Sequence, residues 1–281
     1  LGYYLQSVQG QLGIWQREVP VERLLGDPAL DPQLKAQVER ALRIRDYASR
    51  ELGLPDNRSY RSYADLARPF VVWNVFAAGE FSVEPKQWCF PFAGCVNYKG
   101  YFSEAEARRH AQQLAVEGHD VYVGGVPAYS TIGWFADPLL NTFIRYPEPE
   151  LARLLFHELA HQVVYVKDDT VFNESFATVV EQAGLARWLA DHGSAADRAR
   201  VAQLQRFRAD FRRLVTDARA TLATLYAGGG SIEEKRRRKA EVLDGLRAAY
   251  AAQRLEWGGF AGYDRWFAQP LGNAHLASVA I

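Results

Sequence analysis

Residues 150–165, ELARLLFHELAHQVVY, decide how the rest of the chain is interpreted. Apolar side chains recur there at three- and four-residue spacing, at Leu151, Leu154, Leu155, Leu159 and Val163. This spacing predicts a helix over residues 150–165 with one buried apolar face. The prolines and glutamates of residues 147–150 favour a helix start, because proline is tolerated in the first turn and acidic groups suit the positive end of a helix.

The helix carries a metal-binding motif. His157 and His161 are four residues apart and therefore share a face, so both imidazoles can bind one metal ion. Glu158 is rotated from His157 by about 100° around the helix axis and can address a water molecule rather than the metal. We expect one zinc ion per chain and metal-assisted hydrolysis. In this reaction Glu158 takes a proton from water and passes it to the leaving amine.

A third ligand is expected on a second helix. Residues 171–181, VFNESFATVVE, are apolar at helical spacing and follow the polar turn of residues 167–170. Glu174 falls in the first turn, and an antiparallel helix pair would bring its carboxylate toward the histidines. Thr178 and Glu181 lie four and seven residues further along the same face. We predict that they hydrogen-bond the far nitrogen of a ligand histidine.

These residues resemble the gluzincin metallopeptidases, in which His-Glu-x-x-His is followed by Asn-Glu-x-Phe-Ala on a second helix. The gap between His161 and Glu174 is shorter than in thermolysin or the membrane-alanyl-type aminopeptidases, which excludes close membership of those groups. A nearer resemblance, to the bacterial putative zinc aminopeptidase family, covers most of the chain. It rests on the metal helices together with Gly2-Tyr3-Tyr4, Trp88-Cys89-Phe90, Gly94-Cys95, Gly100-Tyr101-Phe102, Ala128-Tyr129-Ser130-Thr131, Gly133-Trp134-Phe135 and residues 262–267, GYDRWF.

The resemblance implies a zinc peptidase fold, a peptide substrate and often a lipoprotein signal upstream. We therefore expect a lipid anchor before residue 1 and a periplasmic or membrane-anchored location, with the cytoplasm as the alternative. Exopeptidase and endopeptidase activity both stay open. Cys89 and Cys95 flank a short loop containing Pro and Gly that could join them as a disulfide, which suits an oxidising compartment; free thiols are the alternative.

Substrate contacts are expected upstream of the metal helix. Residues 123–131, VGGVPAYST, predict a strand that ends in a turn. In zincins an edge strand beside the metal helix binds substrate through its backbone, and Gly124 and Gly125 would allow close approach; an ordinary strand-to-loop transition is the alternative. Tyr129, Tyr263 and His275 are candidate donors to the tetrahedral intermediate, but no spacing supports this role, and a structural role is favoured for each. An aminopeptidase would also need an acidic group for the substrate ammonium, for which Glu80 is a candidate.

The organisation is helical at both ends and mixed in the middle. Strands are predicted at residues 70–77 and 120–123, and helices at 31–52, 110–117, 197–226 and 232–257. The fold class expected is a mostly helical α+β, zincin-like metallopeptidase, with a small mixed sheet beside the metal-binding helix and a long C-terminal helical hairpin. The chain is expected to form a single domain made of an N-terminal helical segment (1–60), sheet plus metal helices (61–195) and the hairpin with the C-terminal segment (196–281).

Composition gives no reason to expect nucleic acid as a partner or a membrane-spanning segment. The formal net charge is zero, so nothing favours binding to nucleic acid. No apolar stretch approaches the roughly 20 residues that span a bilayer. Two alternatives to a peptidase remain at this level. One is a zinc hydrolase of a non-peptide amide, and the other is a catalytically silent zinc-binding scaffold protein.

Overall fold

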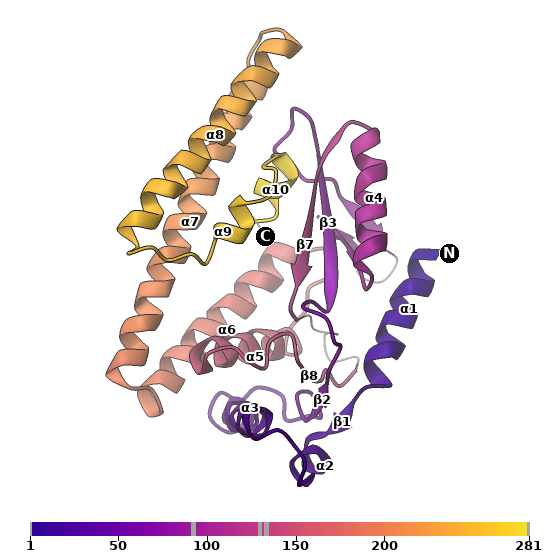
Figure 1. Ribbon diagram of the computed structural model, residues 1–281, viewed down its shortest axis with the longest axis vertical. Helices are drawn as coiled ribbons and strands as arrows, with labels where there is room; N and C mark the ends of the chain where they lie inside the picture. The colour runs from indigo at the N-terminus through magenta and orange to yellow at the C-terminus, as the bar shows by residue number, and fades with distance from the viewer. Residues whose placement is uncertain (1, 91–93, 129–130, 132–134, 280–281) are drawn as a thin grey trace. The chain divides into compact units, whose positions relative to one another are not determined.

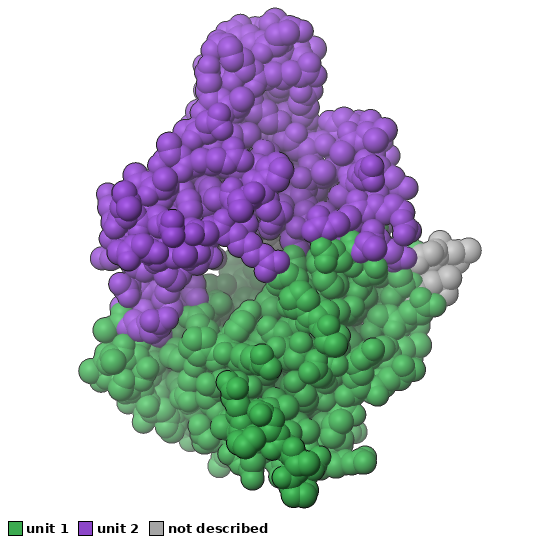
Figure 2. Space-filling view, viewed as in Figure 1, with its two compact units in different colours: residues 1–73, 101–104, 125–199 green, residues 74–100, 105–124, 200–281 purple. Residues whose placement is uncertain are grey.

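The computed structural model describes residues 2–90, 94–128, 131 and 135–279, which are mostly helical and include three small sheets (Figure 1). The chain forms two compact units, coloured separately in Figure 2. The first comprises residues 1–73, 101–104 and 125–199, and the second residues 74–100, 105–124 and 200–281. The predicted mostly helical α+β class is confirmed. The zincin-like arrangement and the single-domain organisation stay predictions.

The first unit is built around the helices that carry the metal-binding motif. Its elements are α1 (Gly2–Trp15), β1 (Val19–Pro20), α2 (Val21–Leu25), α3 (Pro32–Arg50), β2 (Ser62–Ala64), β8 (Leu139–Leu140), α5 (Glu148–Ala160) and α6 (Thr170–Asp191). Strand β2 pairs antiparallel with β1 and parallel with β8, which makes a small mixed sheet. Helix α5 packs against α3 and, more extensively, against α6 (Figure 1). A helix held on two sides keeps its side chains in fixed positions.

Helix α5 starts as the sequence predicts. Pro147 is its N-cap residue, and Glu148 and Glu150 lie in the first turn, where the helix dipole favours negative charge. The helix buries one apolar face with a single charged residue on it. The buried residues are Leu151, Ala152, Leu155, Phe156, Glu158, Leu159 and Ala160.

Helix α5 ends at Ala160, five residues earlier than expected. His161 is the C-cap residue and keeps right-handed helical dihedral angles, with φ −60° and ψ −21°. Two features explain the early end. The β-branched valines that follow favour helix less than leucine does, and the side chain of Asn173 hydrogen-bonds both the N–H and the C=O of Val166, each at 2.8 Å. The connection between the two helices is therefore a held turn rather than a helical extension.

The second unit combines a small sheet with a long helical hairpin. Its elements are β4 (Trp88–Phe90), β5 (Gly94–Val96), α8 (Ile232–Glu256), α9 (Asp264–Phe267), α10 (Asn273–Ala277) and most of β3 (Val72–Gly79), β6 (Lys99–Tyr101), α4 (Glu104–Val116), β7 (His119–Val126) and α7 (Ala195–Ala227). Strand β3 lies between β6 and β7. The predicted hairpin is present as α7 and α8. Gly230, with φ +121°, makes the turn, and Ser231 caps α8 by accepting from the Glu234 N–H at 3.1 Å.

Aromatic and aliphatic side chains at helical spacing form the core of the hairpin. This core includes Phe207, Phe211, Val215, Leu222, Leu243, Leu246, Tyr250, Trp257, Phe267 and Leu276. These residues alternate with charged positions that face water, so each helix has one apolar face. Packing of the two apolar faces against each other stabilises both long helices, in addition to helix propensity.

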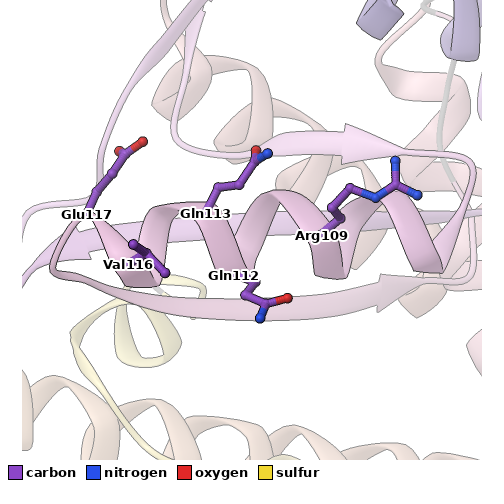
Figure 3. Close-up of a pocket in the computed structure, with 5 residues that line it drawn as sticks. All are labelled: Arg109, Gln112, Gln113, Val116 and Glu117. Carbon is purple, nitrogen blue, oxygen red and sulfur yellow. The ribbon is translucent and has the colours of Figure 1, made fainter.

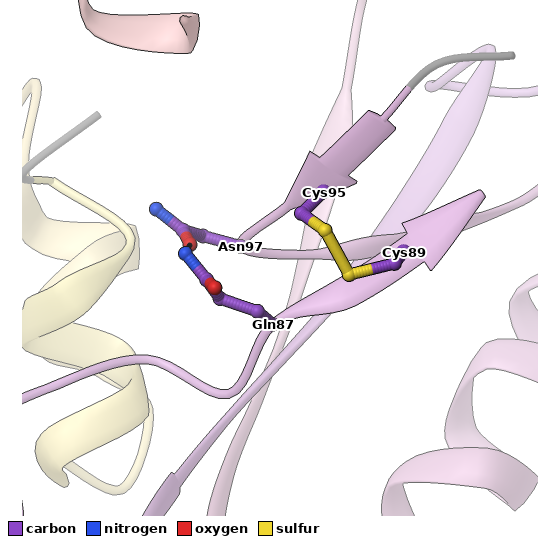
Figure 4. The surroundings of a disulfide bond; sticks show 4 residues. All are labelled: Gln87, Cys89, Cys95 and Asn97. Atoms are coloured by element: carbon purple, nitrogen blue, oxygen red, sulfur yellow. Dashed lines mark hydrogen bonds between the residues drawn. A yellow bond between two sulfur atoms is a disulfide. The ribbon is translucent and has the colours of Figure 1, made fainter. Parts of the chain in front are cut away.

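Strands β4 and β5 form a two-stranded hairpin closed by a disulfide. Cys89 pairs directly with Cys95 across the strands, and their sulfur atoms are bonded (Figure 4). Next to the disulfide, Gln87 Nε2 donates to Asn97 Oδ1 at 3.4 Å (Figure 4). The described residues contain no free cysteine.

Candidate metal centre

Three side chains from α5 and α6 converge on one point. The ligand atoms of His157, His161 and Glu174 all lie within 4.8 Å of one another. The two histidine Nε2 atoms are 3.2 Å apart. Glu174 places Oε2 at 3.4 Å from His157 Nε2 and Oε1 at 3.7 Å from His161 Nε2. The structure therefore brings together the three residues that the sequence proposes as metal ligands.

The separations within this group fit a tetrahedral zinc ion. Zinc binds nitrogen and carboxylate oxygen at about 2.0–2.2 Å, so two donors across a tetrahedral angle lie about 3.4 Å apart. The two Nε2 atoms, at 3.2 Å, and the pair His157 Nε2 and Glu174 Oε2, at 3.4 Å, lie around that value, and His161 Nε2 is 3.7 Å from the other carboxylate oxygen, Oε1. Two imidazoles and one carboxylate also match the ligand set of catalytic zinc sites, in which a fourth position stays open.

A carboxylate behind His157 orients its ring. Glu181 Oε2 lies 2.9 Å from His157 Nδ1, and Glu181 Oε1 accepts from Arg153 Nη1 at 2.8 Å. An ionised carboxylate only accepts, so Nδ1 carries a proton, and Nε2 is the nitrogen that faces the metal position. Arg153 in turn reaches Glu150, with Nε 3.3 Å from Oε2. Glu181 thus has the geometry of the predicted orienting group. Among the hydrogen bonds of the described residues, none joins Thr178 to a histidine of the site.

The electrostatics of the site favour a cation between the ligands. Burial works to lower the pKa of His157, but hydrogen bonds to Glu174 and Glu181 and the charge of Glu158 outweigh it and raise the pKa to about 10. The hydrogen bond from His157 lowers the pKa of Glu174. Burial lowers the pKa of His161 despite the attraction of Glu174. The carboxylates around His157 therefore stabilise a positive charge there, which is a proton in the metal-free protein and would be the metal ion after binding.

Glu158 differs from its neighbours because it lies on the buried face of α5. Its exposed fraction is 8%, and burial raises its pKa to about 7. The charge of His157 opposes this rise, whereas the nearby Asp137 adds to it. A carboxyl group whose pKa lies close to neutrality can both accept and donate a proton. Glu158 thus has the acid–base property that the predicted role requires.

Two supporting residues escape the sequence analysis. Asn173 is buried and fixes the turn after His161 through its paired hydrogen bonds with Val166. Arg153 holds the outer oxygen of Glu181. A sequence signal existed for both, since Arg153 precedes His157 by four residues on one helix face and Asn173 precedes Glu174 directly.

Aromatic rings of the protein itself pack against the two glycines that the sequence proposes for substrate contact. A Cβ atom on Gly125 would lie 2.2 Å from the ring of Phe70, and one on Gly124 would lie 3.0 Å from the ring of Tyr122. The ring of Phe70 leaves no room for a Cβ atom at position 125, and the ring of Tyr122 makes a tight contact at position 124. Tyr129 lies outside the described residues.

The remaining donor candidates lie in packed surroundings. Tyr263 stacks on Phe211 with ring centroids 4.0 Å apart. His275 has no exposed surface and lies against the rings of Tyr122, at 3.9 Å, and Trp266, at 4.0 Å. Burial lowers the pKa of His275 to about 4. Packing accounts for both side chains, and a ring without exposed surface offers no donor to a substrate.

Two further features lie in the second unit. Glu80 pairs with Arg236 through both carboxylate oxygens, at 2.5 and 3.1 Å, so its charge is already compensated and nothing supports a role in holding a substrate ammonium. An open groove follows α4 and is lined by Arg109, Gln112, Gln113, Val116 and Glu117 (Figure 3). Four of them belong to α4 and Glu117 directly follows it, and the five provide no convergent set of catalytic groups.

The sequence as a whole agrees with the site. Residues 2–281 match the family model described as "Putative aminopeptidase". The chain belongs to this family. No curated protein and no solved structure matches the chain. Membership of this aminopeptidase family suggests a peptidase and implies a peptide as the substrate. Among the helices of the described residues, none has the length and hydropathy to cross a membrane.

Proposed function

We propose that the protein is a zinc-dependent aminopeptidase whose active site is the His157, His161 and Glu174 group. The observation that carries the proposal is the convergence of these three ligands with Glu158 directly beside them on α5. Family membership supports the peptidase class, and the donor chemistry supports zinc. A bound zinc ion would supply Lewis acidity, which polarises a carbonyl and makes a water molecule more acidic.

The protein's own residues supply the rest of the chemistry. Glu158, with a pKa near 7, accepts the proton of the attacking water and returns it to the leaving amine. Glu181 keeps the Nδ1 proton of His157 in place, so that the ring holds one orientation throughout. The disulfide of the second unit supports an extracytoplasmic location as part of the proposal, because disulfides persist in oxidising compartments.

Metal analysis combined with peptide turnover tests the proposal. We expect about one zinc per chain, hydrolysis of peptides with a free N-terminus and no hydrolysis of N-blocked peptides. Glu158→Gln should keep its zinc and lose hydrolysis, because this residue is the base and not a ligand. If N-blocked peptides are hydrolysed as fast as peptides with a free N-terminus, the protein is an endopeptidase and not an aminopeptidase. Zinc without turnover of any peptide would refute the peptidase.

A further inference from the structure

Exposed apolar side chains occur in the connection between α5 and α6 and in the first turn of α6. Thirteen large hydrophobic residues are exposed among the described residues, and five of them lie in the short segment between His161 and Glu174. We call these five the apolar rim: Val163, Tyr165, Val166, Val171 and Phe172. Exposed apolar surface that is concentrated in one place marks a site of interaction, whereas scattered single residues do not.

The apolar rim is held in a defined conformation. Asn173 binds both backbone polar groups of Val166 at 2.8 Å, and Asp169 caps α6 by accepting from the Phe172 N–H at 2.9 Å. The rings of Phe172 and Phe176 stack with an interplanar angle of 12°. The rim is therefore fixed relative to the ligands by side chains directly adjoining them. A fixed apolar surface loses little entropy when a partner binds.

One residue of the rim lies on the same face of α6 as a ligand. Val171 precedes Glu174 by three residues, so the two side chains are neighbours along the helix, and Val171 is 79% exposed. Consecutive Cα atoms of a peptide are about 3.8 Å apart. A peptide whose scissile carbonyl lies between His161 and Glu174 therefore brings its neighbouring side chain within reach of Val171.

We propose that the apolar rim receives an apolar side chain next to the scissile bond, so that the preferred substrates are peptides with a residue such as leucine at that position. This inference rests on the proposed function, because it places the substrate carbonyl at the metal centre. The charges of the same segment, Lys167, Asp168 and Asp169, leave it net negative. A negative segment is repelled by the anionic surface of a membrane, which favours a peptide side chain as the occupant.

A charge placed on the rim tests the inference. Val171→Lys in the zinc-loaded protein should lower kcat/KM for a leucine peptide about 10- to 200-fold and lower the leucine-to-glutamate selectivity ratio by a similar factor. Val179→Lys is the matched control. Val179 lies on the same helix and is 65% exposed, but it is five residues past Glu174 and so rotated by about 140° from it. We expect this variant to keep the wild-type selectivity, and both variants to keep the wild-type zinc content.

The result separates the inference from the proposed function. If peptides are cleaved and Val171→Lys keeps the wild-type ratio, the inference is overturned while the peptidase stands. If the wild type cleaves no peptide, the peptidase fails, and anisotropy titration of a fluorescent leucine peptide against the zinc-loaded protein decides the inference. Binding weakened by Val171→Lys but not by Val179→Lys would support it. Equal binding by the three proteins, or binding by none, would overturn it.

Two other occupants of the rim have their own readouts. An unchanged selectivity ratio together with weaker flotation of Val171→Lys on anionic vesicles would assign the rim to a membrane surface. An unchanged ratio together with loss of a wild-type dimer, measured by sedimentation, would assign it to a second copy of the chain. Either result overturns the substrate role.

Discussion

Replacing Glu181 by glutamine should weaken zinc binding, because both oxygens of this carboxylate are used. Oε2 accepts from His157 Nδ1 at 2.9 Å, and Oε1 accepts from Arg153 at 2.8 Å. Glutamine has one acceptor oxygen and one NH2 group. In either orientation of the amide, a donor would then face a donor, at the histidine or at the arginine. The variant therefore loses one of the two contacts and cannot recover it by a flip.

The magnitude follows from the position of this contact behind a ligand. Loss of such an orienting group typically costs 10- to 100-fold in metal affinity, or about 1.4–2.7 kcal/mol. Competition with a chromophoric chelator at a fixed pH measures the dissociation constant for zinc. Glu150→Gln is the control, since Glu150 contacts Arg153 at 3.3 Å and does not reach a histidine. Its effect on zinc affinity should stay within roughly 0.5 kcal/mol, because Glu150 contacts neither a ligand nor Glu181 in its pair with Arg153. Equal zinc affinity of Glu181→Gln and wild type would refute the reasoning.

Three further predictions concern protons and stability. Because the pKa of His157 is raised from 6.5 to about 10, its proton stabilises the metal-free protein fully below about pH 6.5 and progressively less as the pH rises toward 10. Zinc binding at pH 7.5 should accordingly release a proton, seen as buffer-dependent heat in calorimetry; heat independent of the buffer would contradict it. Asn173→Ala should lower the free energy of unfolding in urea by about 1–3 kcal/mol, since it leaves both polar groups of Val166 without their partner; an unchanged midpoint would count against the held turn. Since the pKa of Glu158 is raised from 4.5 to about 7, Glu158→Gln should stabilise the metal-free protein by up to about 3 kcal/mol at pH 8, and this gain should vanish below pH 4.5.

The ligands were predictable because their signal is local. His157 and His161 are one helical turn apart, and Glu174 lies near the start of a helix whose apolar spacing is visible in the sequence. The same holds for the long helices α7 and α8, whose predicted ranges agree with Ala195–Ala227 and Ile232–Glu256 within a few residues. Hydrophobic periodicity over many turns determines such elements strongly, and it says little about where a short connection turns.

The parts that were missed depend on contacts between different segments of the fold. The contact of Arg153 with Glu181 spans 28 residues, and it exists only because α5 packs on α6. The early end of α5 depends on Asn173, which captures Val166 from the following helix. For His275 the sequence left a donor role and a structural role open, and the ring lies among aromatic neighbours. In each case tertiary packing decides between two readings that are equally compatible with the local sequence.

The base and the ligands have different properties because consecutive residues of α5 point in different directions around the helix axis. Successive residues differ by about 100° around the axis, so Glu158 enters the buried face while His157 lies where the carboxylates of α6 can reach it. Burial raises the pKa of Glu158, and the carboxylates raise the pKa of His157, which fixes where protons lie before a metal binds. On a solvated face the carboxyl group of Glu158 would return toward its ordinary pKa and would be a weaker base toward the attacking water. Burying the carboxyl group of Glu158 costs stability, and the same burial gives it the raised pKa that a general base needs. Packing of α5 against α3 and α6 keeps this carboxyl group buried.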